Sequence, residues 1–231
     1  MKKAVVLLSG GMDSAVTLYS AKQDYECRAL IFDYGQKASK EIECAKKIVE
    51  KTGCDHHVLK ISLPWKGSAL LDESLEVPEG SVSQGGDIPS TYVPARNMIF
   101  LSYGVSLAES IGAEAVFIGA HQLDFSNYPD CRGSFFETFR ETVRKGTRSG
   151  SEGREIMIMT PILDKTKREI IETGQALGVP FEYTWSCYRG GKAPCGTCES
   201  CQFRSKAFKE AGVPDPLTTD DRQPTTGENA G

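Results

Sequence analysis

Apolar residues follow two patterns along the chain: short unbroken runs, and longer segments with a helical repeat. The stretch 4–8 (AVVLL) is a short run rich in β-branched residues and is soon followed by glycines, which is typical of a strand buried on both faces. The stretch 38–52 instead has apolar residues on one helical face, and Gly53 follows it. This second pattern predicts an amphipathic helix that ends at the glycine.

The same two patterns alternate through most of the sequence and predict a parallel sheet. The stretch 97–111 is apolar on nearly every side, so we expect a buried helix there. Strands that alternate with helices form parallel sheets with right-handed crossovers, which predicts an α/β fold with helices on both faces of the sheet. The predicted strands are 4–8, 27–34, 56–61, 114–119 and 155–159, and the predicted helices are 13–23, 38–52, 97–111 and 165–177.

Three segments interrupt this alternation. The stretch 64–93 holds four glycines and three prolines, and a connection of this length usually forms a functional lid or an unstructured insert. The stretch 144–154 is polar and basic, which predicts a loop, and 213–231 has few residues that could join a core, which predicts a flexible tail. We therefore expect a sheet domain over 1–180 with a lid-like insert, a small appendage over 181–212, and the tail.

Composition places the chain among ordinary globular proteins. Its 231 residues are 39% hydrophobic and 25% charged, and the net charge is −4, from 27 basic and 31 acidic residues. This weak acidic balance does not favour nucleic acid or an anionic membrane as a partner. The first apolar run is too short for a secretory signal, and no stretch has the length of a membrane helix. We therefore expect a cytoplasmic protein whose eight cysteines are free thiols or metal ligands.

The stretch 9–14 (SGGMDS) lies between the first predicted strand and its helix. Two glycines let the backbone approach a ligand closely, and a helix N-terminus offers unpaired N–H groups to an anion. Ser9 and Ser14 add hydroxyl donors, while Asp13 could cap the helix or hold a metal ion. The loop therefore suits a phosphate, and the alternative is a plain glycine turn with an Asp cap. Neither a Walker-type loop nor the dinucleotide-binding GxGxxG string occurs.

Four cysteines lie within fifteen residues near the C-terminus, at Cys187, Cys195, Cys198 and Cys201. Their spacing is C-x7-C-x2-C-x2-C, with glycines and a proline in the intervening turns. Four thiolates complete the tetrahedral shell of Zn²⁺ and leave no position for a reacting water, which predicts a structural zinc site. An iron–sulfur cluster is the alternative, because the C-x2-C-x2-C string also occurs in ferredoxin patterns.

The 9–14 loop is similar to that of the adenine nucleotide alpha-hydrolase superfamily, in which this loop binds the pyrophosphate of ATP. Further strings resemble one family of that superfamily, the 7-cyano-7-deazaguanine synthase family of queuosine biosynthesis. These strings are the cysteine set, 32–36 (FDYGQ), 91–97 (TYVPARN) and 124–132 (DFSNYPDCR). One departure is Ala95, because the family often has glycine at this position.

This resemblance implies a Rossmann-like fold of the superfamily type and an ATP-consuming carbon–nitrogen ligase. The ligase would convert 7-carboxy-7-deazaguanine and ammonia to 7-cyano-7-deazaguanine through adenylated carboxylate and amide intermediates. The implied cofactors are ATP, Mg²⁺ and one structural Zn²⁺. The implied partners are the small deazapurine substrate, free ammonia and a second copy of the chain in a homodimer. Free ammonia is expected because the chain has no room for a glutaminase domain.

The resemblance also implies which residues form the site. Asp13, Arg96 and Lys167 would be catalytic, with Lys165 as the competing choice for a lysine that contacts phosphate, and His121 is a further candidate at a strand end. The expected ATP-binding residues are Leu8, Ser9, Gly10, Gly11, Met12, Asp13, Ser14, Ala15, Val16, Thr17 and Leu18. The expected substrate-binding residues, which offer carboxylates for N–H edges and rings for stacking, are Asp124, Phe125, Ser126, Tyr128, Asp130 and Arg132.

Two other functions remain open from the sequence. One is a tRNA-modifying thiolase or lysidine-type ligase on the same scaffold, which would need a basic RNA-binding extension. Thiolation would also need a reactive thiol, and Cys131 is the cysteine that lies in a loop suited to this role. The other is a non-catalytic zinc-ribbon binding module that has kept an inactive loop.

Overall fold

The fold is built on one parallel sheet. The computed structural model describes residues 1–80, 88–122 and 128–217. All strand pairs are parallel and the order across the sheet is β3-β2-β1-β4-β5, so the predicted parallel α/β sheet is confirmed. The strands are β1 (Lys2–Leu7), β2 (Tyr25–Asp33), β3 (Asp55–Lys60), β4 (Ala115–Ile118) and β5 (Met157–Met159).

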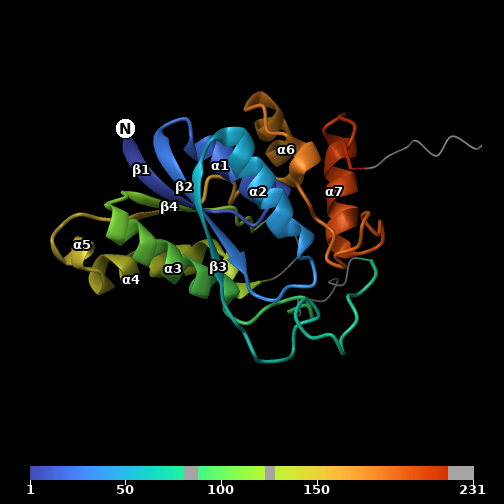
Figure 1. The fold of residues 1–231 in the computed structure, drawn as a ribbon, viewed down its shortest axis with the longest axis horizontal. Helices are drawn as coiled ribbons and strands as arrows, with labels where there is room; N and C mark the ends of the chain where they lie inside the picture. Colours follow the sequence, from blue (N-terminus) through green and yellow to red (C-terminus); the bar gives the residue numbers. More distant parts are fainter. Residues whose placement is uncertain (81–87, 123–127, 218–231) are drawn as a thin grey trace, which may run out of the picture.

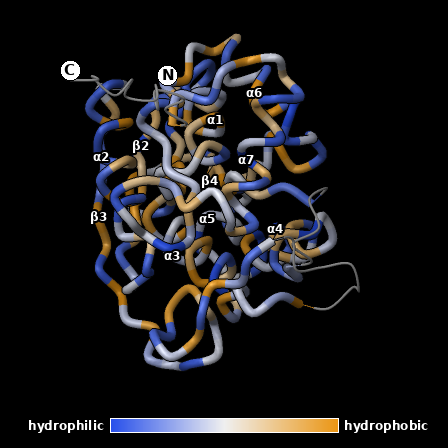
Figure 2. Tube along the Cα trace, turned by 90° about the vertical axis from the view of Figure 1, so that its right-hand side faces the viewer, coloured by the Kyte–Doolittle hydropathy of each residue, from blue (hydrophilic) through white to orange (hydrophobic). Residues whose placement is uncertain are grey.

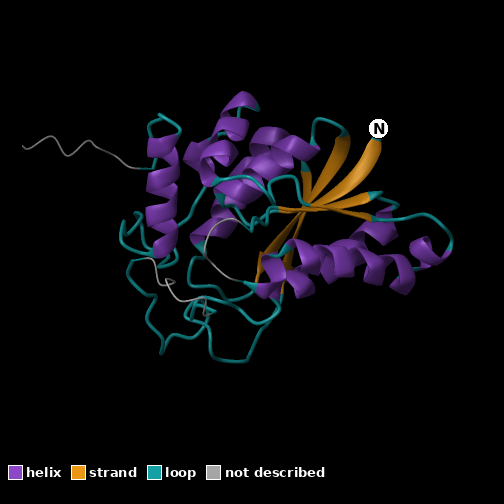
Figure 3. Cartoon of the chain, turned by 180° about the vertical axis from the view of Figure 1, so that it is seen from behind, coloured by secondary structure: helices purple, strands orange, loops and turns teal. Residues whose placement is uncertain are grey.

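Helices cover both faces of this sheet (Figures 1 and 3). The apolar cluster on one face includes residues of α1, α2, α6 and α7, and the cluster on the other face includes residues of α3 and α4. The helices are α1 (Met12–Ala21), α2 (Lys40–Thr52), α3 (Arg96–Ile111), α4 (Gly133–Gly146), α5 (Arg148–Ser151), α6 (Lys167–Ala176) and α7 (Glu199–Glu210), with 3₁₀ turns at Pro129–Cys131 and Phe181–Tyr183.

The central strand β1 contributes to both apolar clusters. Val5 and Leu7 pack with the cluster of α3 and α4, whereas Ala4 and Val6 pack with the cluster of α1 and α2. Successive side chains of a strand point to opposite faces of the sheet, so an unbroken apolar run serves two cores. Helix α2 needs only one apolar side, and it alternates between hydrophilic and hydrophobic stretches in Figure 2.

The polar stretch 144–154 is largely helical, so its prediction as a loop is wrong. Helix α4 continues through Gly146 and α5 follows it directly. These turns are polar because they lie on the surface, where the Glu141 carboxylate pairs with Lys145 one turn later at 2.9 Å. Ion pairs at this spacing stabilise exposed helices, and the charges that suggested a loop therefore belong to a helix.

Helix α3 is less buried than its sequence predicts. Leu101 and Val105 face the core, but Met98 and Tyr103 are 46% and 43% exposed. The expectation of a helix buried on all sides is therefore wrong, because α3 lies in the outer layer and covers only one face of the sheet. None of the described helices, α3 included, is long and apolar enough to cross a membrane.

The part of the insert that precedes the first gap, 64–80, packs against the C-terminal cysteine segment. The Gly80 N–H donates to the Thr197 carbonyl at 2.9 Å, and the Glu79 carboxylate pairs with Arg189 at 3.1 Å. The insert and the cysteine segment also share one apolar cluster. The insert and the cysteine segment therefore pack together, while the rest of α7 packs on the sheet.

The start of the predicted flexible tail, 213–217, is packed against the protein. Asp215 is buried and accepts two hydrogen bonds from the Arg204 guanidinium, at 2.9 Å from Nε and 2.9 Å from Nη2. The same guanidinium donates to the Thr184 hydroxyl at 2.7 Å. Residues 213–217 are therefore not part of a flexible tail, and residues 218–231 lie outside the described residues.

Candidate active site and metal centre

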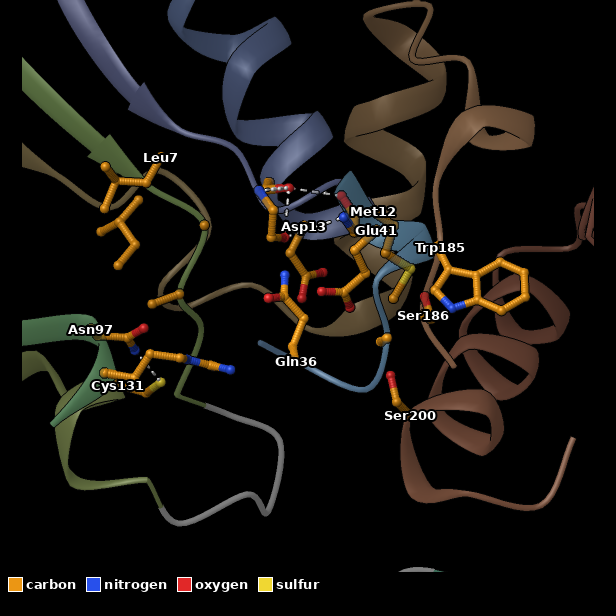
Figure 4. Close-up of a pocket in the computed structure, with 18 of the residues that line it drawn as sticks. Leu7, Met12, Asp13, Gln36, Glu41, Asn97, Cys131, Trp185, Ser186 and Ser200 are labelled. Atoms are coloured by element: carbon orange, nitrogen blue, oxygen red, sulfur yellow. Dashed lines mark hydrogen bonds between the residues drawn. The ribbon is translucent and has the colours of Figure 1, made fainter. Parts of the chain in front are cut away.

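A cavity opens at the carboxyl ends of the strands (Figure 4). In a sheet of this order the connections leave β1 and β4 in opposite directions, and ligands bind in the crevice that results. The 9–14 loop, the first turns of α2 and α3, and the C-terminal segment contribute to its walls. Its lining includes Leu8, Ser9, Gly11, Met12, Asp13, Ser14, Tyr34, Gln36, Glu41, Arg96, His121, Tyr128, Cys131, Lys167, Trp185, Ser186, Tyr188, Glu199, Ser200 and Phe203.

The glycine loop has the geometry of an anion site. Gly10 has a φ of +90°, and a Cβ atom there would lie 2.0 Å from the backbone oxygen of Glu41, so only glycine fits beside α2. The Ser14 hydroxyl accepts hydrogen bonds from the Ser9 N–H at 3.2 Å and from the Ser9 hydroxyl at 3.0 Å. Gly11 is the N-cap of α1 and has no side chain to occupy the first-turn N–H groups. These groups suit a phosphate.

The predicted ATP-binding stretch divides into two parts. The residues at its start line the cavity: Leu8, Ser9, Gly11, Met12, Asp13 and Ser14. Gly10 supports this loop against α2. The residues at its end are fully buried along α1: Ala15, Val16, Thr17 and Leu18. These last side chains hold α1 against the core, so their place in the structure is behind the cavity wall.

Asp13, Lys167 and His121 form a charged cluster in the cavity. Lys167 Nζ lies 2.7 Å from Asp13 Oδ2 and also contacts His121 Nε2, which is 3.5 Å from the same oxygen. Burial alone would raise the pKa of the Asp13 carboxyl, but the charges of Lys167 and His121 outweigh burial and hold this pKa below its usual value. Asp13 is therefore ionised near neutral pH. Of the two candidate lysines, Lys167 lines the cavity and Lys165 is not among its lining residues.

One oxygen of Asp13 is open to a cation. Asp13 Oδ1 is buried and has no hydrogen-bond partner among the described residues. A buried carboxylate oxygen without a donor is costly, and carboxylate oxygens are the ligands that Mg²⁺ prefers in phosphate sites. The residues present therefore fit a divalent cation at this position.

Arg96 is the first residue of α3, and its guanidinium lines the cavity. Nη1 donates to the Tyr34 hydroxyl at 3.1 Å, and the described residues include no carboxylate that forms an ion pair with it. The guanidinium therefore has donors left for an anionic ligand. Asp130 instead accepts a hydrogen bond from the Asn97 N–H at 2.9 Å. This predicted substrate carboxylate thus caps the first turn of α3 and is not among the cavity-lining residues.

The rest of the predicted substrate string is divided between the cavity and other places. Tyr128 lines the cavity, where its hydroxyl is 2.7 Å from Thr91 Oγ1 and its ring lies 5.6 Å from that of Tyr92. Arg132 is the N-cap of α4 and is not among the described lining residues. Three predicted residues, Asp124, Phe125 and Ser126, lie outside the described residues.

Several residues of the cavity carry no sequence signal of their own. Glu41 lies in the first turn of α2, and Glu199, which is 3% exposed, opens α7. The backbone N–H of Trp185 donates to the Gly10 carbonyl at 2.9 Å, and this bond joins the C-terminal segment to the glycine loop. Helices that follow parallel strands begin at the ligand-binding edge of the sheet, so Glu41 could have been found from its place at a helix start. The other unpredicted lining residues include Ser186, Tyr188, Ser200 and Phe203.

Cys131 lies at the cavity but is not activated. The Asn97 side-chain amide donates to its Sγ at 3.2 Å. Burial, together with the charge of Asp130, raises the pKa of the Cys131 thiol to about 12. The thiolate is the nucleophilic form of cysteine, so Cys131 stays protonated and unreactive near neutral pH.

The four C-terminal cysteines form a compact cluster that could hold a metal ion. Their sulfur atoms all lie within 4.8 Å of one another, and Cys195 Sγ is 3.9 Å from Cys201 Sγ. A tetrahedral ion with Zn–S bonds of about 2.3 Å requires ligand sulfurs roughly 3.8 Å apart. Backbone N–H groups donate to two of the sulfurs, at 3.4 Å for Cys187 and 3.3 Å for Cys195. The predicted four-cysteine site is therefore assembled, and its residues fit a single tetrahedral ion.

Comparisons with known proteins give one family over nearly the whole chain. The model of the family described as queuosine biosynthesis protein QueC matches residues 3–212. A 7-cyano-7-deazaguanine synthase of Trichodesmium erythraeum is 49% identical over 222 residues, which cover 93% of this chain and 99% of that protein. A 7-cyano-7-deazaguanine synthase of Clostridium kluyveri is 51% identical over 221 residues, which cover 94% of this chain and 97% of that protein.

Two solved structures align with the chain at much lower sequence identity. The NMN synthetase of Francisella tularensis aligns with a TM-score of 0.47 and 16% identity, over 92% of this chain and 78% of that chain. The U34-tRNA thiolase NcsA of Methanococcus maripaludis aligns with a TM-score of 0.46 and 17% identity, over 91% of this chain and 67% of that chain.

Proposed function

The chain belongs to the family of the queuosine biosynthesis protein QueC, and from this premise we propose that it makes 7-cyano-7-deazaguanine from 7-carboxy-7-deazaguanine, ammonia and ATP. The observation that carries the proposal is the meeting of three groups in one cavity. They are the glycine loop, the Asp13–Lys167 pair and the guanidinium of Arg96. A phosphate site and a carboxylate site that share a cavity suit the adenylation of a carboxylate.

Adenylation is the first step of this reaction. An oxygen of the substrate carboxylate attacks the α-phosphorus of ATP, and the bond to pyrophosphate breaks with its electron pair. The first-turn N–H groups of α1 and the ammonium of Lys167 bind the phosphates, and Arg96 orients the substrate carboxylate. Asp13 would hold Mg²⁺ through Oδ1, and this ion would neutralise phosphate charge. Positioning and electrostatic stabilisation then carry most of the catalysis.

The nitrile requires two activations of the same carbon. Ammonia forms a C–N bond with the adenylated carboxyl carbon, and AMP leaves with the electron pair of the broken C–O bond, which yields the amide. The amide oxygen is then adenylated by a second ATP. Loss of AMP and of the protons on nitrogen gives the nitrile. No step needs a side-chain nucleophile, which agrees with the absence of an activated thiol at Cys131.

The four-cysteine cluster supports a structural zinc ion. An iron–sulfur cluster inserts several atoms between its cysteine ligands, whereas the sulfurs here lie within 4.8 Å of one another. That compactness favours one tetrahedral ion with a closed shell. Metal analysis of the purified protein should find about one zinc per chain. Iron together with acid-labile sulfide would overturn the assignment.

Exchange of labelled pyrophosphate into ATP tests the proposed function. We expect exchange that depends on 7-carboxy-7-deazaguanine and needs neither a nitrogen donor nor tRNA. Exchange only in the presence of tRNA would instead favour a thiolase or lysidine-type ligase, and no exchange at all would favour a non-catalytic module. In complete turnover, ammonium should serve as the nitrogen source. Turnover with glutamine alone would contradict the proposal of free ammonia.

The variant Asp13→Asn tests the assignment of the cavity. It removes the charge that pairs with Lys167 and the oxygen that is open to a cation, so the rate of exchange should fall at least about 100-fold. The matched control is Asp72→Asn, because Asp72 lies in the insert and accepts hydrogen bonds from the nearby Ser74. The control should keep wild-type exchange, and Asp13→Asn should keep the wild-type circular dichroism spectrum. A wild-type rate of exchange in Asp13→Asn would contradict the assignment of Asp13 to the nucleotide site.

A further inference from the structure

We propose that the Glu41 carboxylate binds the incoming nitrogen donor as ammonium and accepts a proton from it. This inference rests on the proposed function and adds a residue that the sequence does not single out. Glu41 lies in the first turn of α2 and lines the cavity. In Figure 4 its side chain extends from α2 into the cavity, between the side chains of Asp13 and Trp185 in this view.

The position of Glu41 connects the phosphate loop with Arg96. A Cβ atom on Gly10 would lie 2.0 Å from the Glu41 backbone oxygen, so the first turn of α2 is in close contact with the glycine loop. The Glu41 carboxylate also interacts electrostatically with the guanidinium of Arg96. If the loop binds the phosphates and Arg96 the substrate carboxylate, the adenylated carbon forms between them. Glu41 borders that place, which is where the nitrogen donor must arrive.

Glu41 has no hydrogen-bond or ion-pair partner for its carboxylate among the described residues. This distinguishes it from Asp13, which pairs with Lys167, and from Asp130, which caps α3. A carboxylate in a cavity is costly to desolvate unless donors reach it. Ammonium supplies N–H donors and a positive charge and is small enough to enter beside a bound substrate. The unpartnered carboxylate therefore fits this ligand.

The surroundings of Glu41 also make it a stronger base than an ordinary carboxylate. Burial raises the pKa of Glu41 to about 7, although the nearby charge of Arg96 opposes this rise. A general base works best when its pKa is close to the working pH. The titratable groups that interact with Glu41 or face it are Arg96, Tyr34, Cys187, Tyr188, Cys44 on its own helix, and Asp13 across the cavity.

Amide formation from ammonium requires a base that removes a proton from the nitrogen. Near neutral pH the nitrogen donor is mostly ammonium, which has no lone pair with which to attack. Transfer of one proton from ammonium to Glu41 produces ammonia. Its lone pair forms the C–N bond, and the C–O bond to AMP breaks with its electrons on the phosphate oxygen. The amide nitrogen then carries one excess proton, which passes to the AMP phosphate, and Glu41 releases its proton to solvent.

The variant Glu41→Gln separates this role from adenylation. The amide side chain keeps the size of glutamate but can neither attract ammonium by charge nor accept its proton. Glu43→Gln is the matched control, because Glu43 lies on the same helix and is exposed. Three rates are measured for each protein: pyrophosphate exchange without a nitrogen donor, nitrile formation as a function of ammonium, and hydroxamate formation with hydroxylamine. Hydroxylamine is mostly neutral near pH 7 and needs no proton removed before it attacks.

We expect Glu41→Gln to keep exchange and hydroxamate formation within about three-fold of wild type. Its rate of nitrile formation at low ammonium should fall at least about 100-fold, and high ammonium should restore part of it. Glu43→Gln should match wild type in all three assays. An unchanged ammonium dependence of Glu41→Gln would overturn the inference, and so would equal losses of exchange and nitrile formation. Absence of exchange in the wild-type protein would instead count against the proposed function itself.

Discussion

Ala95 is the one non-glycine residue of the described chain with a positive φ, at 54°. An L-residue in this left-handed conformation is strained by contact of its Cβ with the backbone. We therefore expect Ala95→Gly to raise the free energy of unfolding by about 0.5 to 1 kcal/mol, as measured by urea denaturation. The position where the resembled family often has glycine thus coincides with a backbone conformation that favours glycine.

The control for this prediction is Ala211→Gly. Ala211 is the C-cap of α7 and has an ordinary helical φ of −77°, so glycine there relieves no strain. Glycine should lower the free energy of unfolding by about 0.5 to 1 kcal/mol at such a position. The two substitutions should therefore have opposite signs, and a loss of stability in Ala95→Gly would contradict the role of strain.

Glu41 gives a prediction about stability that is independent of activity. Burial raises its pKa from the ordinary 4.5 to about 7 in the folded chain. Between pH 4.5 and 7, Glu41 is ionised in the unfolded chain but largely protonated in the folded chain. The contribution of Glu41 to stability is therefore present below pH 4.5 and is lost as the pH rises toward 7. Glu41→Gln cannot ionise. Urea denaturation should therefore show its stability improving relative to wild type from pH 4.5 to 7, and a constant difference would contradict this.

At the scale of elements, Arg204 joins three segments. Its guanidinium, on α7, binds the Asp215 carboxylate and the Thr184 hydroxyl, and both charged side chains are almost fully buried. Arg204→Met leaves the Asp215 carboxylate buried without its cation, so the free energy of unfolding should fall by about 3 to 5 kcal/mol.

The exposed pair of Arg168 with Glu172 supplies the comparison for Arg204. Arg168→Met should change the free energy of unfolding by less than about 1 kcal/mol. The double variant Arg204→Met, Asp215→Leu should recover part of the loss, because it removes the unpaired charge. Equal effects of Arg204→Met and Arg168→Met in urea denaturation would show that burial of the pair does not matter.

Sequence patterns predict best those elements whose buried side chains form a regular apolar pattern. The run 4–8 is apolar because β1 is covered on both faces, and its β-branched residues and the glycines that follow favour a strand. Helix α4 was not predicted: of its residues only Phe136 and Val143 are fully buried, and its charged surface resembles a loop. The lid-like insert could not be placed, since its packing depends on the cysteine segment more than one hundred residues later.

The residues of the cavity also divide into those that the sequence predicts and those that only tertiary packing brings there. Asp13 lies in the 9–14 loop at a strand end, and Lys167, which the family resemblance implies, lies at a helix start. The two side chains meet in the cavity. Asp130 has equally suggestive chemistry, but tertiary structure uses its carboxylate to cap α3. Glu41 carries no local string, and only the contact between α2 and the glycine loop brings it to the cavity. Local patterns therefore identify residues that could act, and packing decides which of them face a ligand.

At the scale of the whole molecule, metal binding by the four-cysteine cluster, as proposed above, should control the order of the insert. The insert reaches the cysteine segment through Gly80 and Glu79, and Val77 packs in the same apolar cluster as Cys187 and Cys198. Removal of the ion proposed for this site would remove the bonds that hold the four sulfurs together, so the insert and the cysteine segment should loosen while the sheet persists. Hydrogen exchange after chelation should therefore increase in 64–80 and remain slow in β1 and β4. Unchanged protection of the insert would contradict this coupling.

The cavity also has a consequence for the synthesis of the protein. The residues that line it extend along the chain from Leu7 to Phe203 on α7. Trp185, whose backbone N–H binds the glycine loop, lies near the end of this span. At about 5 to 20 residues per second, a ribosome has made the glycine loop many seconds before the wall that closes it. A nascent or truncated chain thus carries the glycine loop without a complete cavity. The full set of cavity walls is present only when α7 has left the ribosome.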